Sequence, residues 1–225
     1  MEQQRQRITV WDWGVRLFHW LLVLDFAGLW YTAEQGMMLW HERCGYLMFG
    51  LLLFRWGWGI WGSSTAKLSV LITSPSKVVN FLKSLVQRKT HAEQTVGHNP
   101  AGGWMVLVLL LVLSLQVMTG MMGNDDVFFT GPLAGWVDKD TSDLLTRIHH
   151  IAFNGLLWLA GIHIAAVLWH QFTGERLIEA MISGKKRLAH VAAPSLRKSP
   201  AIIVTVIIAV VLAYCIIHFA PTADY

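Results

Sequence analysis

The chain has 225 residues, of which 54% are hydrophobic and 14% are charged, and 12 are tryptophan. Its mean hydropathy is +0.46. This composition excludes an ordinary soluble domain and indicates an integral membrane protein. The formal net charge is +4, but the sequence has no basic or aromatic motif of the kind that recognises nucleic acid, so we expect no nucleic-acid partner.

The first residues of the chain bear on its processing, and its two cysteines bear on the kinds of cofactor that it binds. The first residues lack an apolar run leading to a small-residue cleavage site, so no cleaved signal peptide is expected. Cys44 and Cys215 form neither CxxC nor CxxCH, which argues against a covalently attached c-type haem and against an iron–sulfur cluster.

The first two expected membrane helices each carry a histidine near one end. Residues 15–33 place His19 about one turn from the helix start, and residues 39–61 begin with His41. Because the chain has crossed the bilayer once between them, the two histidines are expected near opposite surfaces. Asp25 lies near the middle of the first span, about 120° from His19. It is a candidate for proton transfer or for a buried structural acid.

Residues 62–102 connect the second and third spans. Pro75 is typical of a first helical turn, and apolar residues alternate after it with Lys77, Lys83 and Arg88. This pattern predicts an amphipathic surface helix that binds anionic lipid or receives a partner. The third span, residues 103–122, has no histidine and is expected to be a packing helix, and an acidic loop follows it.

The fourth span, residues 144–170, carries four histidines. His149 and His163 are 14 residues apart, which puts them within about 40° of one helix face and about 21 Å apart along the axis. His150 points well off that face, and His170 lies close to where the span should end. One ligand candidate is therefore expected near each membrane surface.

The last part of the chain is expected to be an anchor. We divide the sequence into a four-helix domain over residues 1–190, a basic cytoplasmic linker over 191–200, and a fifth span with a short outer tail over 201–225. The apolar part of that fifth span, residues 201–219, is uniformly aliphatic.

The positive charges predict the orientation. With the N-terminus in the cytoplasm, 15 of the 18 Lys and Arg lie on the cytoplasmic side, and only Arg43, Lys139 and Arg147 lie outside. The C-terminus is then periplasmic. The outer side also receives the acidic loop, whose carboxylates are those of Asp125, Asp126, Asp138, Asp140 and Asp143.

In this orientation the four histidines form two pairs at two depths. His41 and His149 lie toward the outer surface, whereas His19 and His163 lie toward the cytoplasm. Each pair joins two helices, as bis-imidazole ligation of a haem inside a bundle requires. Four independent structural histidines are the alternative. Arg55, which lies 14 residues after His41, either pairs with a haem propionate or is an interfacial arginine beside tryptophans.

Four segments carry a resemblance to a known family. They are VWDWGVRLFHW, LWHERCGY with the later LFRWGWGIWG, GHNPAGGWM, and RIHHIAFNGLLWLAGIHIAAVLWH, and together they cover roughly residues 8–190. The chain resembles the bacterial cytochrome b561 and nickel–iron hydrogenase b-type cytochrome family. That resemblance implies a four-helix membrane bundle with two non-covalent b haems, His41 and His149 ligating the outer one, and His19 and His163 the inner one.

The resemblance also implies a function. It predicts single-electron transfer across the bacterial inner membrane between ubiquinone or menaquinone and a periplasmic c-type cytochrome or hydrogenase. No residue is expected to be catalytic. One alternative is a superoxide oxidase that passes electrons to quinone, with Arg43 and Arg147 attracting the anion. Another is a histidine-based transporter of metal or protons, although Asp25 is almost the only polar midplane group.

Overall fold

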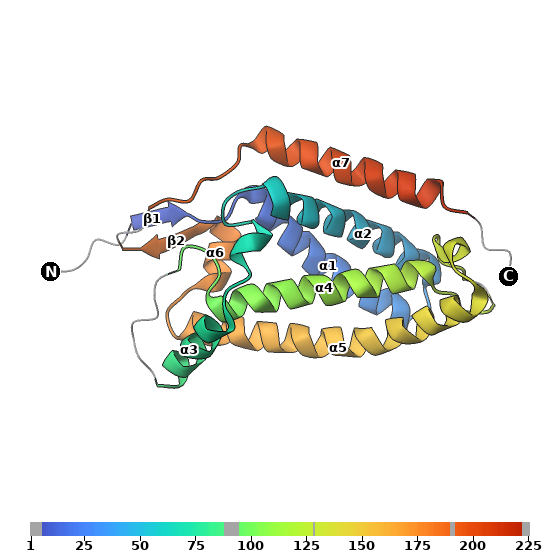
Figure 1. Ribbon diagram of the computed structural model, residues 1–225, viewed down its shortest axis with the longest axis horizontal. Helices are drawn as coiled ribbons and strands as arrows, with labels where there is room; N and C mark the ends of the chain where they lie inside the picture. The colour runs from blue at the N-terminus through green and yellow to red at the C-terminus, as the bar shows by residue number, and fades with distance from the viewer. Residues whose placement is uncertain (1–5, 88–94, 128, 190–191, 222–225) are drawn as a thin grey trace. The chain divides into compact units, whose positions relative to one another are not determined.

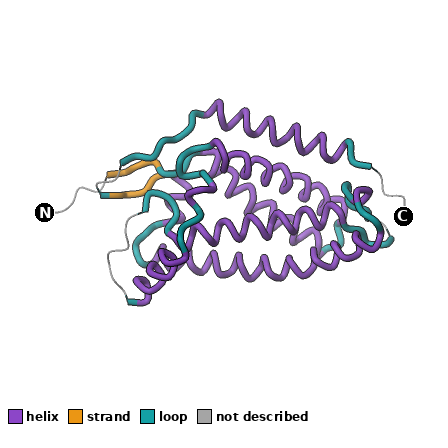
Figure 2. Tube along the Cα trace, viewed as in Figure 1, coloured by secondary structure: helices purple, strands orange, loops and turns teal. Residues whose placement is uncertain are grey.

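The computed structural model describes residues 6–87, 95–127, 129–189 and 192–221. These residues form seven α-helices, two 3-10 turns and two short strands (Figures 1 and 2). The helices are α1 (Trp13–Glu34), α2 (Met38–Trp61), α3 (Pro75–Val86), α4 (Pro100–Met122), α5 (Lys139–Phe172), α6 (Leu177–Ser183) and α7 (Ser199–His218). The strands are β1 (Gln6–Thr9) and β2 (Lys185–Leu188), and the turns are η1 (Leu68–Val70) and η2 (Ala134–Trp136).

The predicted all-helical class is confirmed. The five expected spans coincide to within a few residues with α1, α2, α4, α5 and α7, and the expected surface helix is α3. Arg88, which we placed on that helix, lies outside the described residues. The strands were not predicted, because neither four-residue segment shows the alternation of a half-buried strand.

Three helices, α4, α5 and α7, are long and apolar enough to cross a membrane. Helices α1 and α2 are 22 and 24 residues long, but charged and polar residues lower their hydropathy. These are Arg16, His19 and Asp25 in α1, and Glu42, Arg43 and Arg55 in α2. Many large apolar side chains are exposed, among them Trp158, which is 77% exposed. Exposed apolar surface on such a scale is what a lipid environment covers, and the protein is a multi-pass membrane protein.

The chain divides into two compact units. The first unit comprises Met1–Leu17, Trp56–Val108 and Ile162–Ile202, and the second comprises Phe18–Arg55, Leu109–Gly161 and Ile203–Tyr225.

In the first unit, a short sheet and a buried carboxylate fix the start of α1. Strand β1 pairs antiparallel with β2 (Figure 2). The Val10 and Trp11 amides then donate to the Gly184 carbonyl. Buried Asp12 caps α1 by accepting the Val15 amide at 2.8 Å, and its second oxygen accepts the Trp58 indole N–H at 3.1 Å. The beginning of α1 is thereby tied to the end of α2.

In the second unit, parts of α1, α2, α4 and α5 enclose the candidate site. The buried apolar side chains include Met48 and Phe49 of α2, Leu113 and Val117 of α4, and Leu156 of α5. Because lipid is as apolar as these side chains, van der Waals packing stabilises the contacts between the helices, and the outward faces stay apolar.

Candidate functional site

His41 and His149 come together in the second unit. His41 begins the second turn of α2 and His149 lies in the third turn of α5, and their ring centroids are 6.2 Å apart. The predicted outer pair is therefore adjacent in space. His150 also lies near His149, with ring centroids 6.0 Å apart, but its side chain is exposed.

Each of these two rings is held by a backbone carbonyl of a neighbouring helix. Nδ1 of His41 lies 3.0 Å from the Leu29 carbonyl oxygen on α1, and Nδ1 of His149 lies 2.8 Å from that of Gln116 on α4. Because a carbonyl can only accept, Nδ1 must carry the proton in both rings, and Nε2 is left with its lone pair. This is the tautomer that metal-ligating histidines adopt.

The separation of the rings fits one iron between them. A metal–nitrogen bond of about 2 Å, with the ring centre about 1.2 Å beyond, puts two opposed imidazole centroids about 6 Å apart. The two ring planes are almost perpendicular, at 85°. In the described part of the chain no cluster of three or more His, Cys, Asp or Glu could hold a bare metal ion. A haem needs only two axial ligands, and the residues present fit it.

Gly120 of α4 makes room for the His149 ring. A Cβ at this position would lie 2.7 Å from Cε1 and 2.9 Å from Nδ1 of that ring. Any larger residue would displace an imidazole that its carbonyl bond keeps in place. The sequence predicts a packing helix here, and the structure shows that this helix also supplies the carbonyl and the space for the His149 ring.

The other two predicted ligands lie in different units of the chain. His19 lies on α1 in the second unit, and His163 lies on α5 in the first unit. Their pairing stays a prediction. Arg55 of α2 is buried, with 4% of its surface exposed, and its propionate contact likewise stays a prediction.

His170 has structural contacts. Its buried ring lies 6.4 Å from Phe81 of α3, nearly parallel, and its Nδ1 lies 3.3 Å from Glu175. The hydrogen bond from His170 and the charge of Lys186 lower the pKa of the Glu175 carboxyl. These contacts join the end of α5 to the surface helix.

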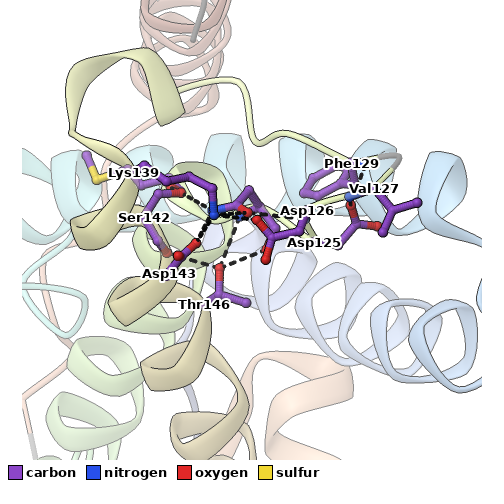
Figure 3. Close-up of polar contacts among 10 residues, drawn as sticks. Asp125, Asp126, Val127, Phe129, Lys139, Ser142, Asp143 and Thr146 are labelled. Atoms are coloured by element: carbon purple, nitrogen blue, oxygen red, sulfur yellow. Dashed lines mark hydrogen bonds and ion pairs between the residues drawn. The ribbon is translucent and has the colours of Figure 1, made fainter. Parts of the chain in front are cut away.

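The acidic loop between α4 and α5 is an ordered network (Figure 3). The ammonium group of Lys139 forms ion pairs with Asp126 and, at 2.6 Å, with Asp143. Asp125 accepts the amides of Val127 and Phe129 at 3.0 and 2.7 Å. Most of the loop carboxylates therefore hold the loop together, which the sequence did not predict.

The loop is also tied to the two helices beside it. Thr146 of α5 accepts the Asn124 amide, and Ser142 donates to the Met122 carbonyl and accepts from Asn124 (Figure 3). The Asp138 carboxylate caps α5 by accepting the Thr141 amide at 2.9 Å and the Thr141 hydroxyl at 3.0 Å.

Comparison with known protein families identifies the family of this chain. The model of the prokaryotic cytochrome b561 family matches residues 10–184. The chain belongs to the prokaryotic cytochrome b561 family. A search among curated proteins found none that matches it.

Membership of the cytochrome b561 family confirms the coarse predictions. Like its relatives, this protein is a membrane-embedded b-type cytochrome that binds haem and transfers electrons. Three features escaped the sequence reading: the two carbonyls that hold the histidines and the glycine beside His149. The carbonyls leave no signal in a sequence, and Gly120 would stand out only by its spacing from a ligand on another helix.

Proposed function

We propose that this cytochrome carries two b haems and relays single electrons across the membrane between the quinone pool and a periplasmic redox protein. The observation that carries the proposal is the pair of His41 and His149, whose Nδ1 atoms are bonded to carbonyls and whose rings are 6.2 Å apart. The iron supplies the one-electron change, and the protein supplies ligands, spacing and electrostatics.

His41 and His149 ligate the outer haem, and His19 and His163 the inner one. The spacing of 14 residues between His149 and His163 supports two haems about 21 Å apart along α5. Arg55, 14 residues after His41, returns to the inner depth and pairs with a propionate there. The four haem-binding helices and the fifth span correspond to α1, α2, α4, α5 and α7.

In the proposed orientation, the protein lies in a bacterial inner membrane with its N-terminus in the cytoplasm and its C-terminus in the periplasm. The distribution of Lys and Arg supports it. Ubiquinone or menaquinone exchanges electrons with one haem. A periplasmic c-type cytochrome or a hydrogenase exchanges them with the other.

Alanine replacements and optical spectra test the haem assignment. We expect His41→Ala or His149→Ala to remove one of two haems, because one axial ligand then lacks its partner across the iron. His19→Ala or His163→Ala should remove the other haem. The measurement is the haem content per chain, together with the Soret and α bands before and after reduction.

His150→Ala is the matched control, because His150 is adjacent to His149 in both sequence and space but is exposed. It should retain both haems. A parent protein with no haem bands, or a His149→Ala variant that keeps two haems, would contradict the proposal.

The partner is tested by ionic strength. Asp140 is exposed and follows the Asp138 cap, whereas Asp125, Asp126 and Asp143 take part in the loop network. We expect Asp140→Asn to slow electron transfer to a basic c-type cytochrome about two- to threefold at low salt, with no difference at high salt. Equal rates at every ionic strength would exclude electrostatic steering by this residue.

A further inference from the structure

The two ligands of the outer site are held by the same arrangement, repeated on two helices. On α1, the Thr32 hydroxyl donates to the carbonyl of Gly28 at 2.8 Å and lies 3.1 Å from that of Leu29. The Leu29 carbonyl is the one that binds His41. Nδ1 of His41 lies 3.4 Å from the Thr32 oxygen itself.

On α4 the same contacts recur with closely similar distances. The Thr119 hydroxyl lies 2.8 Å from the carbonyl of Leu115 and 3.0 Å from that of Gln116. The Gln116 carbonyl is the one that binds His149, whose Nδ1 lies 3.5 Å from the Thr119 oxygen. Each threonine follows the shared carbonyl by three residues, which puts both groups on one helix face.

Both threonines are buried, with 7% of Thr32 and 2% of Thr119 exposed. Because each hydroxyl hydrogen is used on a carbonyl of its own helix, the hydroxyl oxygen directs lone pairs outward. Each Nδ1–H therefore meets two oxygens, a carbonyl at hydrogen-bond distance and a hydroxyl slightly beyond it. In a low-dielectric interior such oriented dipoles act strongly on a neighbouring donor.

We propose that Thr32 and Thr119 are paired positioning residues that set the reduction potential of the outer haem through its two histidines. This inference rests on the proposed function. A second acceptor on Nδ1–H makes the imidazole a better electron donor, because outer partners raise the basicity of a ligating histidine. A more basic ligand favours ferric over ferrous iron. Reduction adds one electron, delivered by a quinol, and the threonines neither gain nor lose a proton.

The experiment is an optical redox titration of the purified protein with both haems in place. In Thr32→Val and Thr119→Val a methyl group replaces the hydroxyl. We expect each valine variant to raise the midpoint potential of the outer haem. At a fixed applied potential, its ratio of ferric to ferrous haem should then fall about three- to tenfold. A tenfold change in this ratio equals about 59 mV for a one-electron couple. The double variant should show the sum of the two shifts.

Serine variants and a third threonine provide the controls. Thr32→Ser and Thr119→Ser keep the hydroxyl and should keep the parent potential. Thr173 donates to the Trp169 and His170 carbonyls in the same way but contacts no proposed ligand, so Thr173→Val should change neither haem. The inner haem is the internal reference, and the component lost in His149→Ala identifies the outer one.

The possible outcomes separate this inference from the proposed function. An outer potential unchanged in both valine variants overturns it, as does an equal shift in the serine variants. If a valine variant loses the outer haem while its serine counterpart keeps it, the hydroxyl positions the ligand and the inference stands. Loss of that haem in both variants overturns it. A parent without haem overturns the proposed function instead.

Discussion

At the scale of single residues, the geometry of the His41 and His149 pair depends on groups other than the two imidazoles. A histidine in a helix bundle can turn about two side-chain torsions, and a carbonyl bond on Nδ1 selects one orientation and one tautomer together. His41 obtains this bond from Leu29 and His149 obtains it from Gln116. Both acceptors lie on helices other than the ligand's own, so the ligand geometry depends on how α1 and α4 pack.

Gly120 provides a sharp test of that dependence. We expect Gly120→Ala to cost the protein its outer haem and to spare the inner one, because the added methyl group would lie 2.7 Å from Cε1 of His149. The measurement is haem content and the amplitude of each component in a redox titration.

Gly28→Ala is the matched control. The new Cβ would make an ordinary contact of 3.6 Å with Sγ of Cys44, and alanine favours a helix over glycine by about 1 kcal/mol. It should retain both haems. Equal haem content in the two alanine variants would show that the His149 ring can move aside.

At the scale of elements, α2 and α5 present their histidines with nearly perpendicular rings. The angle of 85° follows from where α1 and α4 place the two carbonyls. If His41 and His149 held one haem iron in this orientation, two d orbitals of the ferric iron would have nearly equal energies, and its low-spin signal would be highly anisotropic.

We therefore expect the oxidised protein to give such a strongly anisotropic low-spin signal in electron paramagnetic resonance. The signal should disappear in His149→Ala and persist in His163→Ala. A rhombic signal typical of parallel imidazoles at the outer site would show that the rings rotate when haem binds.

The start of α5 is fixed by one carboxylate outside the membrane. Hydrogen bonds from the Thr141 amide and, as the second cause, from the Thr141 hydroxyl hold the pKa of the Asp138 carboxyl below its ordinary value of 3.8. A lowered folded-state pKa means that this residue stabilises the fold above pH 3.8, and that the contribution is lost as the pH falls through the lower folded value.

We expect Asp138→Ala to lower the melting temperature at pH 7, and the difference from the parent to shrink as the pH falls below 3.8. Thermal unfolding in detergent, followed by haem absorbance and circular dichroism, measures both. Asp140→Asn is the control, because it keeps the Asp138 cap, and it should lower the melting temperature less than Asp138→Ala does. A difference that does not shrink at all as the pH is lowered below 3.8 would mean that the Asp138 cap does not act through its charge.

At the scale of the whole molecule, charge and hydropathy decide which way the chain crosses the bilayer. We expect a cysteine at position 140 to react with a membrane-impermeant thiol reagent from the periplasm, and one at position 198 only after the membrane is opened. The measurement uses a chain in which Cys44 and Cys215 are replaced by serine. The reverse labelling pattern would invert the proposed topology.

The sequence by itself determined the membrane class, the helices, the family and the histidines to be examined, because apolar spans, turn residues and a spacing of 14 residues are properties of one chain segment. It did not reveal β1 and β2, since a four-residue pair exists only through its partner. The sequence also predicted the pairing of His41 with His149, and the tertiary structure showed that their rings are adjacent. Only the tertiary structure showed that Leu29 and Gln116 orient them and that Gly120 makes room. These facts depend on contacts between helices, and side-chain periodicity predicts a face but not what lies opposite it.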